Sequence, residues 1–363
     1  MNAMEPCKKR ENRIRFGIIG SGWRALFYVR AAKALPERFE LTGVVCHTKD
    51  KAQAFAAEHG VFASASLEEL LKTQPEFVIC CVNKDSMAGI AARLMEAGMP
   101  ALCETPLATH IGTLRELYAV QRRTGTLLEL AEQYFLYPTH QARRALIDAG
   151  MLGHVTGCQL SMVHDYHAVS LFRFYLGDEN GRVDIRANRQ AFPILITGGR
   201  EGYVPGRKTG EETRVMAQFA YADGRLAAYD FAGTQYHSAI RSSHIRILGT
   251  RGEIFDREVR CLGEDGRPLH AGLTISRDAM TGTLRAIDFE GRRVYQNPFG
   301  WEVPLSEEDI AVCGVLERMG GSVRGGRRHY PLAHAFRDAY MACLMQGAAE
   351  EDGRIHTVDM DWD

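Results

Sequence analysis

The sequence predicts an α/β protein with an N-terminal doubly wound parallel sheet and a C-terminal α+β domain on a large, mostly antiparallel open sheet. Three observations lead to this prediction. Short apolar runs alternate with helical patterns over the first 131 residues, a glycine-rich turn follows the first run, and residues 183–300 are strand-like and rich in turns. A chain of 363 residues has room for about two domains.

Five strands and five helices are expected in the first part of the chain. The run FVICCV is unbroken and apolar, as in a strand buried on both faces. Gly60 closes one helix, and Ser66 caps the next. The expected strands lie at 13–20, 40–46, 77–82, 100–104 and 126–131. The expected helices lie at 23–35, 50–60, 66–73, 86–98 and 110–125.

The pattern changes after Pro138. Helices are expected at 139–153, 166–177, 306–319 and 331–347, and a strand at 154–163. The alternating runs on either side of ADG (213–233) predict a β-hairpin, and those around GTRG (243–255) predict a second. Residues 198–212 are the most loop-like stretch, a candidate mobile loop. Strands grouped between helices favour a mostly antiparallel α+β domain.

Composition narrows the class of protein. Apolar residues make up 45% and charged residues 25%, and the net charge of −1 gives no global field that favours nucleic acid or an anionic membrane. No apolar run approaches the roughly 20 residues of a membrane span. The start, MNAMEPCKKRENR, has no apolar segment of a secretory signal, and residues 1–12 are expected to be disordered. Nine cysteines, an odd number without a CxxC pair, indicate reduced thiols in a cytoplasmic protein.

The glycine-rich turn has the form G-x-G-x-x-A, with Gly20, Gly22 and Ala25 between the first strand and the first helix. The first glycine permits a tight turn, the second lets a pyrophosphate approach the backbone, and the helix N-terminus favours its negative charge. Residues 13–132 are therefore expected to be a dinucleotide-binding domain. Trp23 and Arg24 lie inside the motif and are candidate cofactor contacts.

The end of the second strand bears on which dinucleotide is bound. NAD is usually held there by an Asp or Glu on the ribose 2′-hydroxyl. This chain has His47, Thr48 and Lys49 instead, and no carboxylate before Asp50. An imidazole, a hydroxyl and an ammonium suit a 2′-phosphate, which favours NADP over NAD. Lys49 could equally be a solvated loop lysine.

Three segments stand in order along the chain: FGIIGSGWRA, FVICCVNKDSMAGIAARLMEAGMPALCETPLA and EQYFLYPTHQARRALIDAGMLGHV. They resemble the Gfo/Idh/MocA oxidoreductases, named for glucose–fructose oxidoreductase, inositol dehydrogenase and a rhizopine-catabolism protein. The resemblance implies a Rossmann domain followed by a substrate and oligomerisation domain, here 133–363, whose open sheet often pairs with a second copy. It implies a homodimer or homotetramer and hydride transfer between NAD(P) and a hydroxyl or carbonyl carbon, most often of a sugar or cyclitol.

The resemblance also implies positions for the cofactor. Val82 and Asn83 fall in a loop that lies along it, and Glu104 and Gln133 fall near the ribose and nicotinamide. The family's E-K-P sequence is replaced here by E-T-P, so Thr105 stands where a lysine usually handles the substrate proton. A threonine hydroxyl only hydrogen-bonds near neutral pH. Either Thr105 packs locally, or proton transfer has moved to another residue.

The HDYH sequence is the second departure from the family pattern. His167 takes the position of the family's histidine in D-x-G-x-H-x-x-D, while Ser170 and Val163 replace the two aspartates. At a helix start the dipole disfavours imidazolium, so His167 is the candidate acid/base. Asp165 could orient it or offset that effect. The catalytic candidates are His167, Asp165, Tyr166, His164 and Thr105.

Two other interpretations of HDYH stay open. Asp165 could cap the helix, or His164 and His167 could hold a metal, although no third ligand has diagnostic spacing. We predict no metal. Candidate contacts to a carbohydrate-like small molecule are Tyr137, Arg173, Arg189, Gln235 and His237.

The leading hypothesis is an NAD(P)-dependent oxidoreductase acting on a sugar, sugar acid, cyclitol or glycoside, with His167 as acid/base. Some proteins that resemble this family are glycosidases that oxidise a sugar transiently, and they also lack the lysine at the position of Thr105. A non-catalytic dinucleotide-binding sensor is the third possibility, because the family's lysine and aspartates are missing.

Overall fold

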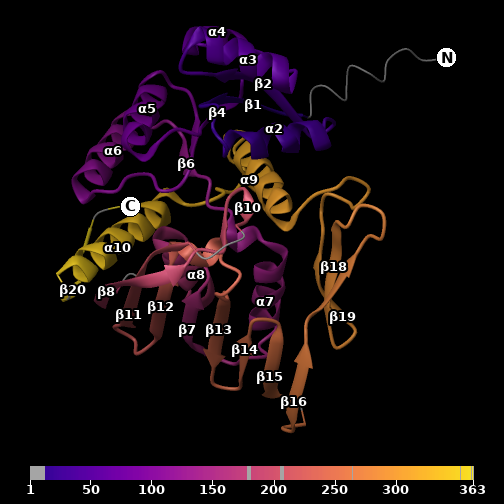
Figure 1. Cartoon of the computed structure of the whole chain (residues 1–363), viewed down its shortest axis with the longest axis vertical. Helices are drawn as coiled ribbons and strands as arrows, with labels where there is room; N and C mark the ends of the chain where they lie inside the picture. Colours follow the sequence, from indigo (N-terminus) through magenta and orange to yellow (C-terminus); the bar gives the residue numbers. More distant parts are fainter. Residues whose placement is uncertain are drawn as a thin grey trace.

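The computed structural model describes residues 13–177, 181–204, 208–263, 265–351, 353–360 and 362. The predicted disorder of residues 1–12 lies outside these ranges. The chain forms a six-stranded parallel sheet and a nine-stranded mostly antiparallel sheet, which lie one above the other in Figure 1. The predicted fold class is confirmed. The predicted boundary between 132 and 133 falls between the last strand of the first sheet and the first strand of the second.

The first sheet has the strand order β3-β2-β1-β4-β5-β6, in which all neighbours run parallel. The strands are β1 Ile14–Ile19, β2 Phe39–Val45, β3 Ala63–Ser64, β4 Phe77–Cys80, β5 Ala101–Cys103 and β6 Leu128–Leu130. The helices are α2 Ala25–Ala34, α3 Lys49–His59, α4 Leu67–Lys72, α5 Lys84–Glu96 and α6 Ile111–Thr124. The order reverses between β1 and β4, where open α/β sheets bind ligands. The sequence missed β3, whose two residues are too few to show a strand pattern.

The second sheet has the order β16-β15-β14-β13-β7-β12-β11-β8-β20. Only the neighbours β12 and β7 run parallel. Its strands are β7 Val155–Ser161, β8 Val183–Leu195, β11 Thr209–Tyr221, β12 Leu226–Ala232, β13 His244–Gly249, β14 Gly252–Phe255, β15 Glu258–Leu262, β16 Pro268–Gly272 and β20 Arg354–His356. Both predicted hairpins are present, as β11–β12 and β13–β14.

The structure corrects the prediction of a loop at 198–212. The short strands β9 Gly198–Gly199 and β10 Gly202–Tyr203 pair with each other, and Thr209 already begins β11. The long strand β8 pairs with β11 as far as Leu195, so the sheet continues into residues whose composition indicated a loop. A further three-stranded sheet holds β17 Thr274–Arg277, β18 Leu284–Phe289 and β19 Arg292–Gln296.

Helices join the two sheets. Both α8 Asp165–Leu176 and α10 Leu332–Glu350 pack on the nine-stranded sheet, α10 also contacts α6 and β6, and α7 Pro138–Asp148 packs against β18 and β19. Helix α9 Glu307–Val323 packs against α2 and β1 of the first sheet and lies between the two domains in Figure 1. Two short 3-10 turns, η1 Tyr134–Leu136 and η2 Gly233–Tyr236, complete the chain's helical elements.

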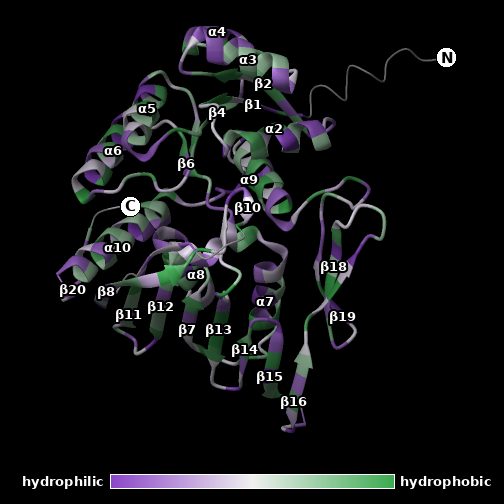
Figure 2. Cartoon of the chain, in the orientation of Figure 1, coloured by the Kyte–Doolittle hydropathy of each residue, from purple (hydrophilic) through white to green (hydrophobic). Residues whose placement is uncertain are grey.

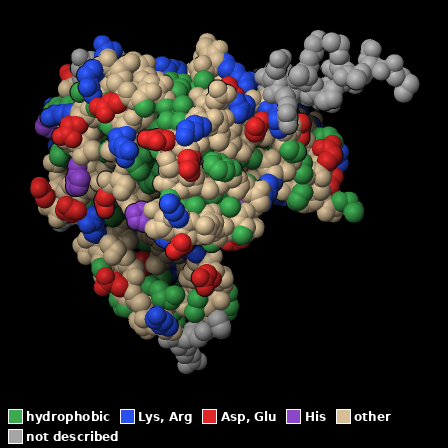
Figure 3. All heavy atoms as spheres, turned by 90° about the horizontal axis from the view of Figure 1, so that it is seen from above, with side chains coloured by type: hydrophobic (Ala, Val, Ile, Leu, Met, Phe, Trp, Pro, Cys, Tyr) green, Lys and Arg blue, Asp and Glu red, His purple; other side chains and the backbone are tan. Residues whose placement is uncertain are grey.

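Burial follows the sequence patterns. The strand β4 is buried along its whole length, as the unbroken apolar run FVICCV predicted, and β5 is buried as well. Figure 2 shows hydrophobic and hydrophilic residues side by side around α5 and α6, as expected of helices with one buried face. On the face seen in Figure 3, Lys and Arg are interspersed with Asp and Glu. Among the described helices, none has the length and apolar character that crossing a membrane requires.

Candidate active site

The glycine-rich turn fits a dinucleotide pyrophosphate. Gly20 has φ +107°, and a Cβ there would lie 2.1 Å from the Cys81 carbonyl oxygen, so only glycine fits. A Cβ on Gly22 would meet no described atom within 4 Å, so that side of the turn is open. Within the described residues, no side chain caps α2 and no acidic residue lies in its first turn. The positive end of α2 favours an anion here, although the first amides of the helix already donate to carbonyl groups of the turn.

The residues after β2 and β4 begin helices. Thr48 caps α3 by accepting a hydrogen bond from the Lys51 amide at 3.3 Å, while His47 and Lys49 are exposed. Asn83 caps α5 by accepting from the Ser86 amide at 2.9 Å, and Val82 before it is half-buried. All of these positions lie at the carboxyl ends of parallel strands, where the cofactor of such a sheet is expected.

Arg24 lies between two carboxylates. Its Nε donates to Glu104 at 2.7 Å and its Nη1 to Glu308 of α9 at 2.8 Å. With the Gln133 amide oriented to satisfy its neighbours, Gln133 accepts from Arg24 at 3.2 Å as well. This guanidinium clamps the first domain to α9, and its contact with the cofactor stays a prediction.

Glu104 is buried beside two donors. Besides Arg24, it accepts a hydrogen bond from the Tyr28 hydroxyl. Burial, together with the Glu104 carboxylate, raises the pKa of Tyr28 well above its usual value. Tyr28 thus remains a neutral donor, and Glu104 stays fixed at the end of β5, immediately before Thr105.

His167 lies between a hydroxyl and a buried carboxylate. Its Nδ1 is 2.7 Å from Glu132 Oε2, and its Nε2 is 3.3 Å from Thr105 Oγ1. The Glu132 side chain is 0% exposed, and its Oε1 accepts from the Tyr134 amide at 2.9 Å. Because a carboxylate only accepts, Nδ1 carries the proton and donates to Glu132, which leaves the Nε2 lone pair toward Thr105. This is the arrangement of a base whose tautomer is fixed by a buried partner.

His164 is a neighbour of His167. Its ring centroid lies 4.8 Å from that of His167, and its Nδ1 is 2.7 Å from the Tyr236 hydroxyl. Burial, with His167 and Lys84 nearby, lowers the pKa of His164 to about 3. His164 is therefore neutral in the physiological range and is not the proton donor that an imidazolium would be.

Asp165 and Tyr166 do not take the predicted places. The Asp165 carboxylate accepts from Gln346 Nε2 at 2.6 Å and from the Tyr229 hydroxyl at 3.2 Å, and Glu132 rather than Asp165 orients His167. Asp165 has φ +29°, a conformation that is rare outside glycine. Tyr166 is buried, and burial beside Tyr330 and Asp338 raises the pKa of its hydroxyl well above the usual value.

The capping and metal interpretations of HDYH find no support. His164 occupies the cap position of α8, and in this described segment no side chain caps the helix. His164 and His167 have no third ligand among the residues that the structure describes, where no group of three or more such side chains could hold a metal.

The predicted substrate contacts are dispersed. Tyr137 stacks on Tyr134 at 5.2 Å, and Tyr134 in turn lies 4.5 Å from the His167 ring, so Tyr137 belongs to the site. Arg173 instead forms a buried ion pair with Asp338 at 2.8 Å. Arg189 hydrogen-bonds Gln346, which also holds Asp165.

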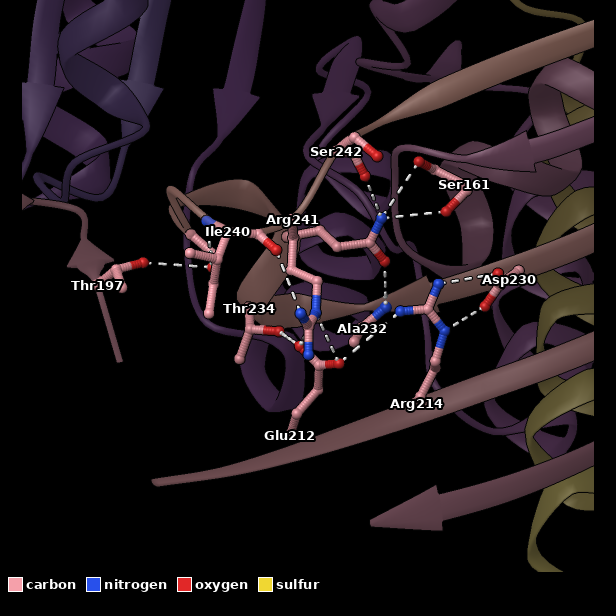
Figure 4. A network of polar contacts seen from close by, with 12 residues as sticks. Ser161, Thr197, Glu212, Arg214, Asp230, Ala232, Thr234, Ile240, Arg241 and Ser242 are labelled. Atoms are coloured by element: carbon pink, nitrogen blue, oxygen red, sulfur yellow. Dashed lines mark hydrogen bonds and ion pairs between the residues drawn. The ribbon is translucent and has the colours of Figure 1, made fainter. Parts of the chain in front are cut away.

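Gln235 and His237 lie after β12. The Gln235 side-chain amide accepts from the Ala232 amide and donates to Ser161 and Ser242, while its contact with the substrate stays a prediction. Figure 4 shows these partners beside a second network, in which Arg241 donates to the buried Glu212 at 3.2 Å. His237 is exposed.

A cavity of about 370 Å³ opens beside His164, and neither His167 nor Thr105 is among its lining residues. It lies between α10, the start of α6 and the HDYH turn, and its polar lining includes Lys84, His164 and Asp165, with Pro106 adjoining Thr105. Such a volume suits a small molecule.

Sequence reasoning missed Glu132 and Tyr134. Glu132 directly precedes Gln133 at the carboxyl end of β6, where ligand-facing residues gather, and that position was the available signal. Its partner His167 lies 35 residues away, so no spacing joined the two.

Comparison with known proteins bears on the family and the fold. The family model described as "Oxidoreductase family, NAD-binding Rossmann fold" matches residues 14–131. The trans-1,2-dihydrobenzene-1,2-diol dehydrogenase of Oryctolagus cuniculus is 30% identical over 244 residues, which cover 65% of this chain and 73% of the relative. The scyllo-inositol 2-dehydrogenase (NADP(+)) IolU of Bacillus subtilis is 27% identical over 157 residues, 42% of this chain and 48% of the relative.

A solved structure extends the likeness to the whole fold. Levoglucosan dehydrogenase in complex with NADH and levoglucosan superposes with a TM-score of 0.70 at 16% identity, covering 96% of this chain and 100% of that one. The likeness includes the nine-stranded sheet, beyond the reach of the family model. Fold, glycine-rich turn and relatives together identify the chain as a member of the Gfo/Idh/MocA family of NAD(P)-dependent oxidoreductases.

Proposed function

We propose that this protein interconverts a hydroxyl and a carbonyl group on a sugar, sugar acid, cyclitol or glycoside, with His167 as the acid/base. The observation that carries the proposal is the His167 imidazole held between Glu132 and Thr105. The nicotinamide of NAD(P), when bound, supplies hydride transfer to or from the substrate carbon. The protein's own residues then handle the proton.

His167 takes the proton at Nε2 during oxidation of the alcohol and returns it during reduction. Glu132 supports both directions, because its buried carboxylate fixes the neutral tautomer and stabilises the imidazolium that forms. Thr105 accepts or donates a hydrogen bond at the same nitrogen and so positions the substrate hydroxyl. The family lysine's proton-handling role thereby moves to His167.

The relatives support the substrate class. Their names describe dehydrogenases of a dihydrobenzene diol, of scyllo-inositol and of levoglucosan. The cavity beside His164 has room for one such ring, and Lys84 and His164 offer it polar contacts. Glu104, Val82, Asn83, Gln133 and the residues of the glycine-rich turn would line the cofactor. Exposed His47 and Lys49 after β2 favour NADP over NAD.

We also propose a cytoplasmic homodimer or homotetramer that pairs through the nine-stranded sheet. The described cysteines are free thiols, as in a reducing compartment. The sheet face away from α8 and α10 carries Met216, which is 53% exposed, beside Asn188, Gln218 and Asp230. Light scattering on the purified protein, repeated with Met216→Arg, tests this pairing, since a charge in the interface should shift the mass toward the monomer.

Turnover measured at the reduced-nicotinamide absorbance, with a panel of sugars, cyclitols and diols, tests the proposed reaction. We expect His167→Ala to lower kcat by about 10²- to 10⁴-fold while the affinity for NADPH stays within about twofold. Thr105→Ala should cost about tenfold, because only a hydrogen bond is lost. An unchanged kcat in His167→Ala would exclude His167 as the acid/base.

A glycosidase mechanism is the second candidate, favoured by Thr105 in place of lysine. A chromogenic glycoside separates the two functions. Release of the chromophore without net formation of NADH or NADPH supports the glycosidase, whereas stoichiometric cofactor turnover supports the oxidoreductase.

A further inference from the structure

We infer that Arg200, from the second domain, binds the pyrophosphate of the dinucleotide across the glycine-rich turn. The inference rests on the family's dinucleotide binding and goes beyond the proposed reaction, because it concerns a contact to the cofactor supplied by the substrate domain. Arg200 lies at the tip of the β9–β10 hairpin, in the stretch that the sequence indicated to be a loop.

The turn itself supplies no unpaired cation. Arg24 is the arginine of the motif, and its guanidinium is neutralised by Glu104 and Glu308. What remains are the backbone N–H groups and the positive end of α2, which stabilise only part of the two negative charges of a pyrophosphate. A guanidinium from elsewhere in the chain would complete the charge balance.

Arg200 reaches the turn from the other domain. Its guanidinium carbon lies 5.1 Å from the centre of the Trp23 ring, and Trp23 is the residue directly after Gly22. The Trp23 side chain is 54% exposed and packs edge-on against Phe27 one helical turn later. An exposed tryptophan at this place forms a platform that holds a guanidinium over the start of α2.

Among the residues that the structure describes, Arg200 forms no ion pair with an Asp or Glu. An arginine fork matches the geometry of phosphate oxygens and forms charge-assisted hydrogen bonds with them. From its position beside the turn, Arg200 can pair with the phosphate group of a ligand bound there.

The base of the hairpin is fixed, which holds the tip in place. Gly199 pairs with Gly202, and the Val204 amide donates to the Thr197 carbonyl at 3.1 Å. The Thr197 hydroxyl accepts from the Ala239 amide at 2.8 Å, and a Cβ on Gly198 would lie 2.0 Å from the His237 carbonyl oxygen. The hairpin therefore packs closely against residues 237–239 and presents Arg200 from a rigid support.

Calorimetric titration of the full chain tests the inference without any turnover. The probes are NADH, NADPH, ADP-ribose, which keeps the pyrophosphate but has no nicotinamide, and AMP, which has no pyrophosphate. We expect Arg200→Ala to weaken NADH, NADPH and ADP-ribose by the same factor of about 10- to 100-fold and to leave AMP unchanged. Glu201→Ala, at the same tip, is the matched control and should not weaken binding.

Other outcomes would overturn the inference. If Arg200→Ala bound all the probes within twofold of the wild type, Arg200 would not contact the pyrophosphate. A loss of affinity confined to NADPH would show that Arg200 contacts the 2′-phosphate instead. An altered KM for the sugar with unchanged ADP-ribose affinity would show that Arg200 contacts the substrate instead of the pyrophosphate. Arg200→Gln, which keeps a long polar side chain without the charge, gives the same comparison if the alanine variant is unstable. Since ADP-ribose binding needs no chemistry, failure of the proposed reaction leaves this test intact.

Discussion

The glycine-rich turn after β1 and the start of α8 both contribute to the candidate site, but they are built in different ways. The turn depends on six consecutive residues, from Gly20 to Ala25, and on the backbone conformation that they allow. The proposed acid/base His167, at the start of α8, depends on Glu132 after β6 and on Thr105 after β5. A site made of backbone can be predicted from a short motif, whereas a site made of side chains requires the fold.

Replacing Glu132 by Gln should have the largest effect on this comparison. The amide keeps the shape and can still accept from His167, but it loses the charge that stabilises the imidazolium. We expect kcat to fall by about 10²-fold and the rising limb of the pH–rate profile for oxidation to move to lower pH. Steady-state kinetics from pH 5 to pH 9 measures both. The control is Glu129→Gln, which removes another buried carboxylate at the end of the same sheet.

A profile that does not move in Glu132→Gln, with kcat reduced, would mean that Glu132 only packs. In that case the start of α8 would be no more dependent on distant residues than the turn is.

Two glycine variants test the backbone of the glycine-rich turn. Gly20→Ala places a Cβ 2.1 Å from the Cys81 carbonyl oxygen at φ +107°, and we expect a loss of about 3 kcal/mol in unfolding free energy. Gly22→Ala faces open space, so its stability should change by less than about 0.5 kcal/mol, while NADH affinity falls about tenfold. Urea denaturation and NADH titration separate the two. Equal unfolding free energies of the two variants would contradict the different roles assigned to Gly20 and Gly22.

His329 is expected to make the stability of the protein depend on pH. It is buried in the segment between α9 and α10, and burial, with Arg318 nearby, lowers its pKa to about 3. In the unfolded chain His329 binds a proton near the ordinary histidine pKa of about 6.5, whereas the buried ring of the folded chain stays neutral. The contribution of His329 to the unfolding free energy is therefore present above about pH 6.5 and is lost as the pH falls toward 3. Between pH 7 and pH 5 we expect a loss of about 2 kcal/mol from this residue.

Urea denaturation of His329→Phe at both pH values measures that loss. The ring of His329 stacks against Phe135, so an aromatic replacement keeps the packing and should flatten the pH dependence. An equally steep dependence in the variant would assign the acid sensitivity to other groups.

Among the variants that are expected to lose stability, Thr48→Ala should lose the least. The hydroxyl caps α3, and loss of an N-cap costs about 1 kcal/mol. Thr48→Ser should restore most of it, because serine accepts the same hydrogen bond. Thermal unfolding measures the difference. If the alanine variant unfolded at the wild-type temperature, the cap would contribute nothing to stability.

Much of the fold could be predicted from sequence because its elements are local. The strands of the first sheet, apart from the two residues of β3, and the hairpins around Gly224 and Gly252 follow from apolar runs and turn residues. The hairpin at 198–203 could not, because its strands are two residues each and are stabilised by contacts with residues 237–239.

The candidate site was only partly predictable. His167 could be placed from its helix start, but the choice of Glu132 over Asp165 as its partner is decided by which strand end faces it. Arg24 was expected to contact the cofactor because of its place in the motif, and only the fold brings Glu308 to it from 284 residues away. Charged side chains reach partners that no spacing reveals.

The clamp formed by Arg24 has a consequence for how the molecule is made. Glu308 lies on α9, and residues 131–306 separate that helix from the last strand of the first sheet. During synthesis the nucleotide domain therefore leaves the ribosome well before the helix that covers α2 and pairs with Arg24. Until α9 arrives, one face of that domain is uncovered and Arg24 lacks one of its carboxylates, so the nascent domain is an incomplete binding unit rather than a finished one.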